Sequence, residues 1–289
     1  MQGDRLIDEF LKLAFGSNCR LEGSRSLGGG CINNATRVVT NKGLFFIKWN
    51  ANAPEDMFEK EAQGLALLSE SDAIGVPAFH FRGKLNGVDF MILEYLESGL
   101  KSSNYWTLLG EELAALHRCN AENHGLQHDN YIGRLPQSNQ QHNSWVTFFR
   151  TERLQRQVEL AQSQGLMNPD QLKQFDKLYH RLPELIPEVN PSLMHGDLWS
   201  GNVHTGPDGK AWLIDPAVYF GHREMELAFT SMFGGFDREF YFAYDANYPL
   251  EPDHTDRIDL YNLYPLLVHL NMFGTSYLSG ILQTLRHYT

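Results

Sequence analysis

The chain has 289 residues, 42% of them hydrophobic, which is enough for two lobes built around one cleft. Its formal net charge is −11 and no basic run stands out, which argues against a nucleic-acid partner. No apolar run approaches the length of a membrane-spanning helix, so we expect no membrane association. The three cysteines are widely spaced, and segment 1–16 has the pattern of an amphipathic helix rather than a signal peptide. We therefore expect a cytoplasmic protein, with the oligomeric state left open.

The hydrophobic pattern of the N-terminal part predicts a helix over 4–15 and strands over 20–27, 34–40 and 44–49. The first two strands are joined by the sequence Gly28-Gly29-Gly30-Cys31-Ile32-Asn33. Glycines let backbone N–H groups approach phosphates closely, so Gly28, Gly29 and Gly30 are candidates for binding the phosphates of ATP. The alternative is a flexible hairpin turn, because the pattern is neither G-x-G-x-x-G nor a P-loop.

A lysine and a glutamate follow on neighbouring elements. Lys48 ends the strand over 44–49, and Glu61 lies on the apolar face of a helix predicted over 54–68. A carboxylate on that face needs a partner. Kinases use such a Lys–Glu pair to hold the α- and β-phosphates of ATP, and we predict that role for Lys48 and Glu61. The alternative is an exposed glutamate at the edge of the helix.

The segment 89–96 is an apolar strand that runs into a connector, as in the hinge of kinases. We expect Leu93, Glu94, Tyr95 and Leu96 to surround the adenine of ATP, with a plain buried strand as the alternative. The sequence thus predicts an α+β, bilobal protein-kinase-like fold. Its N-terminal lobe, 1–97, is an antiparallel sheet plus helix, and its C-terminal lobe, 98–289, is mainly helical.

The C-terminal part predicts helices over 105–117, 145–164, 171–182, 221–235 and 258–277. A long polar connection is expected over 125–145. The aromatic and acidic segment 233–252 is expected to be a loop over the substrate site.

The most informative stretch is His195-Gly196-Asp197-Leu198-Trp199-Ser200-Gly201-Asn202, followed by Ile214-Asp215-Pro216. Its spacing matches the kinase catalytic loop H-R-D-L-x-x-x-N and the later metal-binding Asp. Asp197 is predicted to accept the proton of an attacking hydroxyl, and Asn202 and Asp215 offer the hard oxygen ligands that suit Mg²⁺. Gly196 replaces the arginine that docks a phosphorylated activation loop, which favours a small-molecule kinase.

With these motifs the chain resembles the fructosamine kinase (ketosamine-3-kinase) family, within the protein-kinase-like superfamily that also holds aminoglycoside and choline kinases. The resemblance covers nearly the whole length. It is carried by the glycine segment, Leu113-Ala114-Ala115-Leu116-His117, Asp129-Asn130-Tyr131-Ile132-Gly133, Trp145-Val146-Thr147-Phe148-Phe149, the catalytic loop, Asp215-Pro216-Ala217, Gly221-His222-Arg223-Glu224 and Leu270-Asn271-Met272-Phe273-Gly274.

The resemblance implies phosphorylation by ATP and Mg²⁺ of the C3 hydroxyl of a ketoamine, free or attached to a protein lysine, leading to deglycation. It makes Trp199, Arg223, Glu224 and His269 candidates for contacting the substrate. Their structural alternatives are a salt bridge within the lobe for Arg223 and Glu224, and a core histidine for His269. Position 226, where some relatives have Asp, is Glu, and its role is left open.

Two other functions compete with the ketoamine kinase. One is a kinase of another small cationic metabolite, such as an aminoglycoside or choline. The other is a nucleotide-binding pseudokinase, against which the intact Lys48, Asp197, Asn202 and Asp215 argue. Separately, the thiol of Cys31 in the glycine segment is a candidate redox switch, with an inert small residue as the alternative.

Overall fold

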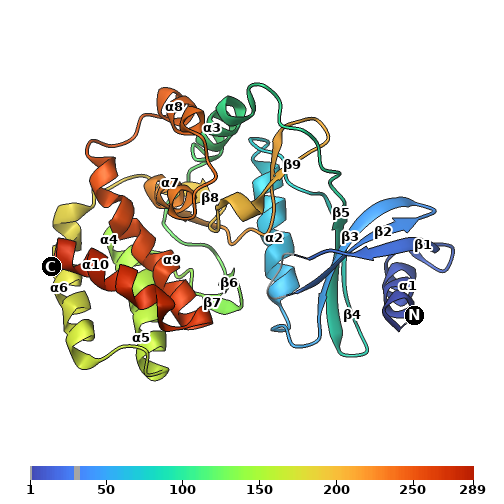
Figure 1. The fold of residues 1–289 in the computed structure, drawn as a ribbon, viewed down its shortest axis with the longest axis horizontal. Coiled ribbons are helices and arrows are strands. Elements are labelled where there is room, and N and C mark those ends of the chain that lie inside the picture. The colour runs from blue at the N-terminus through green and yellow to red at the C-terminus, as the bar shows by residue number, and fades with distance from the viewer. Residues whose placement is uncertain (1, 29–32) are drawn as a thin grey trace.

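The computed structural model describes residues 2–28 and 33–289 (Figure 1). A sheet with two flanking helices lies at the right of Figure 1, and a mainly helical lobe lies at the left. This arrangement is the predicted α+β, bilobal fold. Gly29, Gly30 and Cys31 lie outside the described residues, so their assigned roles in phosphate binding and redox control stay predictions.

The N-terminal lobe contains a five-stranded antiparallel sheet with the strand order β1-β2-β3-β5-β4. Its strands are β1 (Leu21–Ser26), β2 (Asn34–Thr40), β3 (Gly43–Asn50), β4 (Phe79–Leu85) and β5 (Val88–Glu94). Side chains of successive residues point to opposite faces, so β3 supplies Phe45 and Ile47 to one layer and Phe46 and Lys48 to the other.

One helix packs against each face of this sheet. Helix α1 (Gln2–Phe15) places Phe10 on Phe90, with ring centroids 4.0 Å apart. Helix α2 (Met57–Glu70) places Phe58 and Leu65 against Met91 of β5. Because α2 lies between the sheet and the C-terminal lobe (Figure 1), its residues can reach both lobes.

Helix α2 begins three residues later than the sequence predicts. Asp56 stands at the N-cap position but does not cap the helix with its side chain. Its carboxylate instead accepts a hydrogen bond from the hydroxyl of Tyr131, 2.5 Å away in the C-terminal lobe. The side chain at the N-cap of α2 therefore makes a contact between the lobes that local sequence does not reveal.

Segment 233–252, which we expected to be a loop over the substrate site, contains helix α8 (Arg238–Asn247), and that expectation is wrong. Asp237 caps the helix, because its side chain accepts from the N–H of Glu239 at 3.0 Å. Phe240 and Tyr244 bury its inner face against α3 (Tyr105–Leu116). Gly110 makes this close packing possible, because a Cβ there would lie 2.4 Å from the Phe240 carbonyl oxygen.

The connection expected over 125–145 contains a short hairpin, β6 (Asn130–Ile132) and β7 (Leu135–Gln137). The predicted helix over 145–164 is interrupted by a π-helical segment, because α4 (Trp145–Phe148) runs into η1 (Phe149–Gln155) and then α5 (Arg156–Ser163). The π segment contains the buried Arg153, whose guanidinium lies 4.0 Å from the ring centroid of Tyr219. Aromatic packing around one charged side chain accompanies this local change of helical pitch.

The remaining elements complete the C-terminal lobe. The helices are α6 (Pro169–Leu185), α7 (Arg223–Met232), α9 (Ile258–Phe273) and α10 (Leu278–Tyr288), with 3₁₀ turns η2 (Ser200–Asn202), η3 (His254–Arg257) and η4 (Thr275–Tyr277). Two antiparallel strand pairs, β8 (Ser192–Met194) with β11 (Tyr219–Gly221) and β9 (Val203–Thr205) with β10 (Ala211–Leu213), lie on either side of segment 195–202. Among the described residues, none of the helices is both long and apolar enough to cross a membrane.

Candidate active site

The segment predicted to be catalytic leaves β8 through a turn that requires glycine. Gly196 has a φ of 84°, in the left-handed region. A Cβ at this position would lie 2.0 Å from the carbonyl oxygen of Ala217. The absence of an arginine here therefore has a steric reason as well as the functional one inferred from sequence.

His195 ties this segment to the strand that precedes Asp215. Its Nε2 lies 2.9 Å from the carbonyl oxygen of Ile214, and its Nδ1 accepts from the N–H of Asp197 at 3.3 Å. Burial lowers the pKa of His195, which favours the neutral ring that these two contacts require. The ring of His195 therefore links the backbone at Asp197 to the residue that precedes Asp215.

Asp197 is partly buried and is held by Asn202. The amide nitrogen of Asn202 donates to both Oδ2 and the backbone oxygen of Asp197, each at 2.9 Å. Burial raises the pKa of Asp197 well above its ordinary value, although the Asn202 hydrogen bond opposes that shift. A carboxylate with a raised pKa is a better proton acceptor than a free one, which suits a general base.

Lys48 on β3 and Glu61 on α2 are brought together where the helix packs against the sheet. The Nζ atom of Lys48 lies 2.8 Å from Oε1 of Glu61 and 2.8 Å from Oδ1 of Asp215. Burial alone would lower the pKa of Lys48, but the two carboxylates raise it above its ordinary value. The lysine is therefore cationic, as a partner of phosphate oxygens must be.

The oxygens of Asn202 and Asp215 fit a divalent cation. Because Asn202 donates with its amide nitrogen, its carbonyl oxygen is left to act as a ligand. Asp215 has a φ of 55°, an uncommon backbone conformation for aspartate, and its side chain is 49% exposed. Within the described residues no three His, Cys, Asp or Glu side chains cluster as a metal site. Mg²⁺ needs no such cluster, because one or two protein oxygens, water and phosphates complete its shell.

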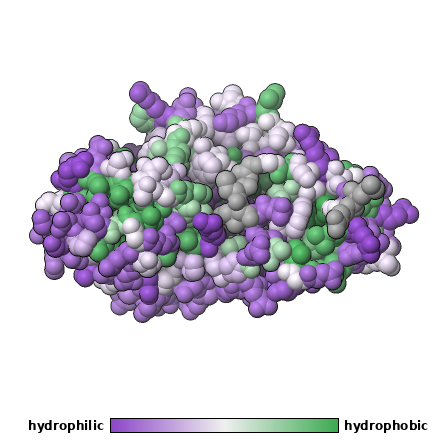
Figure 2. Space-filling view, turned by 60° about the horizontal axis from the view of Figure 1, so that its bottom comes forward, coloured by the Kyte–Doolittle hydropathy of each residue, from purple (hydrophilic) through white to green (hydrophobic). Residues whose placement is uncertain are grey.

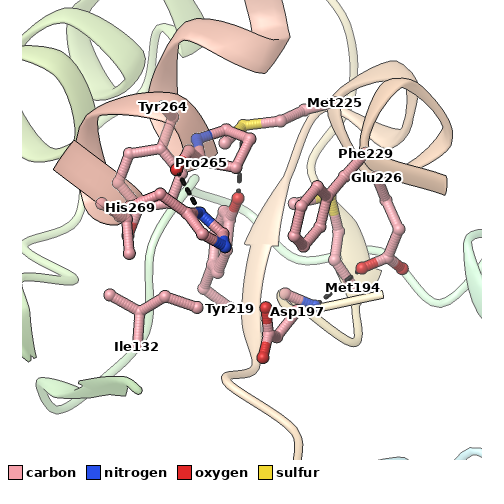
Figure 3. A pocket seen from close by; sticks show the side chains of 12 residues that line it. Ile132, Met194, Asp197, Tyr219, Met225, Glu226, Phe229, Tyr264, Pro265 and His269 are labelled. Atoms are coloured by element: carbon pink, nitrogen blue, oxygen red, sulfur yellow. Dashed lines mark hydrogen bonds between the residues drawn. The ribbon is translucent and has the colours of Figure 1, made fainter. Parts of the chain in front are cut away.

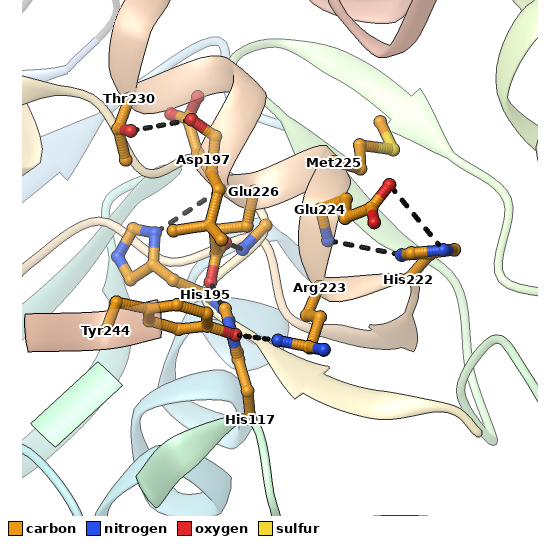
Figure 4. A network of polar contacts seen from close by, with 12 residues as sticks. His117, His195, Asp197, His222, Arg223, Glu224, Met225, Glu226, Thr230 and Tyr244 are labelled. Carbon is orange, nitrogen blue, oxygen red and sulfur yellow. Dashed lines mark hydrogen bonds and ion pairs between the residues drawn. The ribbon is translucent and has the colours of Figure 1, made fainter. Parts of the chain in front are cut away.

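Sequence reasoning left the role of Glu226 open, and the structure places its carboxylate against the backbone of His195 and Gly196 (Figure 4). Oε1 accepts from the N–H of Gly196 at 2.7 Å, and Oε2 accepts from the N–H of His195 at 3.0 Å. His117, the residue that follows α3, contacts the same Oε2 at 2.9 Å and Tyr244 of α8 at 2.7 Å. An acidic residue inside the buried helix α7 was the only sequence signal for this network.

The substrate roles predicted for Arg223 and Glu224 need correction, because both side chains are buried in structural contacts. Glu224 forms a bidentate pair with Arg257, with both N–O distances 2.8 Å. Arg223 stacks on Tyr248 with its guanidinium carbon 3.8 Å from the ring centroid. It also donates to the Tyr248 carbonyl at 2.8 Å. These contacts attach the segment after α8 to α7, and they occupy the charges that a substrate would need.

Unlike Arg223 and Glu224, the other two predicted substrate residues, Trp199 and His269, are partly exposed, and both lie near Asp197. A small pocket of about 30 Å³ lies beside Asp197, and His269, Phe229 and Tyr264 are among its lining residues (Figure 3). Nδ1 of His269 donates to the Pro265 carbonyl at 2.6 Å, and Figure 3 shows the other ring nitrogen turned toward the pocket. Burial lowers the pKa of His269, which leaves that nitrogen a hydrogen-bond acceptor.

The predicted adenine hinge follows β5. The N–H of Glu94 donates to the Ala78 carbonyl at 2.8 Å, and its carboxylate accepts from the Ala78 N–H at 3.1 Å. These contacts fix the end of β5, where Leu93 is buried and Tyr95 and Leu96 are partly exposed. Gly28, the first residue of the glycine segment, is exposed after β1. The contacts of the hinge with adenine and of Gly28 with phosphate stay predictions.

Comparisons with known sequences identify the family of the chain. The family model for fructosamine kinase matches residues 4–289. The chain is 38% identical to a probable ketoamine kinase of Synechocystis, with 94% of this chain and 92% of that protein covered. It is 36% identical to the chloroplastic protein-ribulosamine 3-kinase of Oryza sativa subsp. indica, with 96% and 81% covered.

Comparisons with solved structures identify the same fold. A crystal structure from Haemophilus somnus, with the provisional name fructosamine-3-kinase, has a TM-score of 0.87 at 30% identity and covers 98% of this chain and 96% of its own. An aminoglycoside phosphotransferase solved with AMP-PNP and hygromycin B has a TM-score of 0.63 at 17% identity, with 97% of each chain covered. The predicted kinase-like fold is confirmed.

Proposed function

Because this chain belongs to the fructosamine kinase family, we propose that it transfers the γ-phosphoryl group of ATP to the C3 hydroxyl of a ketoamine. The observation that carries the proposal is the placement of the carboxylate of Asp197 beside both Asn202 and a pocket edged by His269. A hydroxyl in that pocket would have a proton acceptor, and the phosphates of ATP would face the cation of Lys48.

In this mechanism Asp197 accepts the proton of the C3 hydroxyl as its oxygen attacks the γ-phosphorus. Lys48, held by Glu61, binds phosphate oxygens, while Glu94 and Leu96 hold the adenine through their backbone. Asn202 and Asp215 would hold Mg²⁺, which neutralises charge on the phosphate oxygens when it is bound. We also propose that the protein works in the cytoplasm, where MgATP is abundant. The free thiols of Cys19 and Cys119 fit that compartment.

The polar groups around the pocket suit a sugar. Nε2 of His269 accepts a hydrogen bond from a hydroxyl, and the exposed ring of Trp199 offers a flat apolar surface for the C–H face of the sugar. The secondary ammonium next to C1 carries a positive charge, which the net charge of the protein attracts.

Phosphorylation at C3 makes the adduct unstable. Loss of a proton from C1 gives an enamine, whose nitrogen lone pair expels phosphate from C3. Water then releases the amine and leaves a dicarbonyl sugar. The kinase would thus reverse glycation although it breaks no carbon–nitrogen bond itself.

We expect MgATP with a ribulosamine or fructosamine to give ADP first, and inorganic phosphate and free amine more slowly. Coupled ADP detection with phosphate and amine assays on the same samples would measure both phases. Choline and aminoglycosides should give no reaction or a stable phosphate ester. Turnover of those compounds without ADP from any ketoamine would move the assignment to another metabolite kinase, and no turnover at all would favour the pseudokinase.

Lys48→Ala should lower kcat by about 10²- to 10³-fold, because it removes a cation that faces the phosphates of ATP. The substitution also leaves the carboxylates of Glu61 and Asp215 without the cation between them. Lys84→Ala is a matched control, since Lys84 on β4 forms partly exposed ion pairs with Glu55 and Asp89. Steady-state kinetics with ATP as the varied substrate would test this, and unchanged ATP kinetics in Lys48→Ala would remove Lys48 from the site.

A further inference from the structure

An uninterrupted row of aromatic rings leads away from the catalytic segment. We define the aromatic strip as Trp199, Phe233, His269, Phe273 and Tyr277. Ring centroids lie 6.0 Å apart from Trp199 to Phe233 and 5.2 Å apart from Phe233 to His269. From His269 the distances are 5.5 Å to Phe273 and 5.0 Å to Tyr277. Four separate elements of the C-terminal lobe therefore contribute to one continuous surface.

The strip is exposed to an extent that packing alone does not explain. Trp199, Phe233 and Phe273 are 38%, 44% and 51% exposed, and they are three of the seven large exposed hydrophobic residues in the described part of the chain. On the face shown in Figure 2, apolar residues gather over the C-terminal lobe at the left, within a mainly hydrophilic surface. Adjacent exposed aromatic rings are typical of binding surfaces, whereas isolated ones are common on any protein.

The two ends of the aromatic strip lie at different distances from Asp197. Trp199 is two residues from Asp197, and His269 lines the pocket beside it. Phe273 ends α9, and Tyr277 ends the next short turn, on the far side of His269. Neither Phe273 nor Tyr277 lines the pocket. The inner end can therefore contact the sugar, and the outer end can contact only what extends beyond it.

We propose that Phe273 and Tyr277 bind the substituent on the amine of the ketoamine, and that this contact makes the enzyme prefer a long aliphatic substituent such as a lysine side chain. The inference rests on the proposed ketoamine kinase activity. In a ketoamine the ammonium is bonded to C1, so the carbon chain beyond it leaves the sugar on one side. With the C3 hydroxyl at Asp197 and the sugar at Trp199 and His269, that chain follows the strip outward.

The chemistry of the outer end fits a chain of methylene groups. The rings of Phe273 and Tyr277 lie next to each other with centroids 6.4 Å apart, so an alkyl chain can lie across both of them. The guanidinium of Arg134 donates to the carbonyl of Met272, the residue before Phe273, at 3.0 Å. Burying each methylene against such rings favours binding, because apolar surface leaves water. A methylamine adduct has no chain to place there.

The test compares two ketoamines of the same sugar, one of methylamine and one of the side-chain amine of lysine blocked at both ends. In the parent protein we expect kcat/KM for the lysine adduct to exceed that for the methylamine adduct by about tenfold, from the extra methylenes. Phe273→Ala and Tyr277→Ala should each reduce that preference by at least about threefold. Turnover of the methylamine adduct should stay within about twofold, since the strip's inner end is intact. Phe242→Ala on α8 is the control, because Phe242 is equally aromatic and 72% exposed but outside the strip.

The outcomes separate the two proposals. If every variant phosphorylates the methylamine adduct and keeps the parent's preference for the lysine adduct, the role of Phe273 and Tyr277 is overturned. The proposed ketoamine kinase activity would not be affected by that result. Equal losses on both adducts would also overturn the role of the two rings, because they would show that the rings only support His269. No phosphorylation of either adduct by the parent protein would overturn the proposed function itself.

Discussion

Asp197→Asn is expected to lower kcat by about 10²- to 10⁴-fold, the range that a general base contributes. Asparagine keeps the shape of the side chain and an oxygen that can accept from the amide of Asn202, now 2.9 Å from Asp197. It has no basic site for the proton of the attacking hydroxyl. ATP affinity should change little, because Asp197 does not contact the predicted adenine or phosphate residues. Rapid-quench measurement of phosphoryl transfer, with nucleotide binding followed separately, would check both statements.

The pH dependence provides a second measurement of the same group. Burial raises the pKa of Asp197, so the acid limb of kcat/KM should lie above the ordinary value of 3.8, and activity should fall as pH drops through that raised pKa. This limb should disappear in Asp197→Asn. The substitution should not reduce stability at neutral pH, since it removes a charged group from a buried position near Asp215 and Glu226. A parent-like pH profile and near-parent turnover would exclude Asp197 as the base.

The geometry of the candidate catalytic residues could be predicted from sequence because their spacing encodes it. The distance along the chain from Asp197 to Asn202 is set by one tight turn, so a single loop brings the two side chains together. The pairing of Lys48 with Glu61 could be anticipated for a similar reason. A charged residue on the inner face of a strand and an oppositely charged one on the inner face of the next helix have few other partners, because buried charges must be paired.

The residues that sequence reasoning misplaced depend on contacts between distant segments. Glu224 was considered with its neighbour Arg223, but its partner is Arg257, which η3 brings to it from 33 residues away. Helix α8 was missed because its aromatic residues suggested an exposed loop, whereas Phe240 and Tyr244 are buried against α3. Whether an aromatic or charged residue faces solvent or a neighbour is decided by packing that local patterns do not contain.

Glu226, next to Asp197, is another residue whose contacts local sequence does not reveal. Local sequence marks it only as an acidic residue in an apolar helix, while the structure gives its carboxylate three donors from two segments. Burial alone would raise the pKa of Glu226, but its hydrogen bond with His117 and the N–H of Gly196 keep it below its ordinary value. The carboxylate is therefore ionised and sets the backbone positions on either side of Gly196.

Glu226→Gln is expected to lower both stability and activity. One side-chain oxygen becomes an NH₂ group, which must face the N–H of Gly196 or the donors at His195 and His117, so a buried donor loses its acceptor. Losing one partner of a buried charged network costs about 3 to 5 kcal/mol of unfolding free energy. We expect kcat to fall by about 10²-fold as Asp197 loses its fixed position, since small displacements at a reacting group are costly. Denaturant unfolding and steady-state kinetics would measure the two effects.

The difference in unfolding free energy between the parent protein and Glu226→Gln should depend on pH, which tests the contacts of Glu226 separately. A carboxylate whose pKa is lower in the folded protein contributes stability that is complete above its ordinary value of 4.5 and is lost as pH falls through the lowered pKa. The gap in unfolding free energy between the parent protein and Glu226→Gln should therefore be largest at neutral pH and should narrow in acid. Glu226→Asp, which keeps the charge but withdraws it by one methylene, should recover part of the stability and less of kcat. If Glu226→Gln matched the parent in kcat, the carboxylate would be a structural anchor that does not position Asp197.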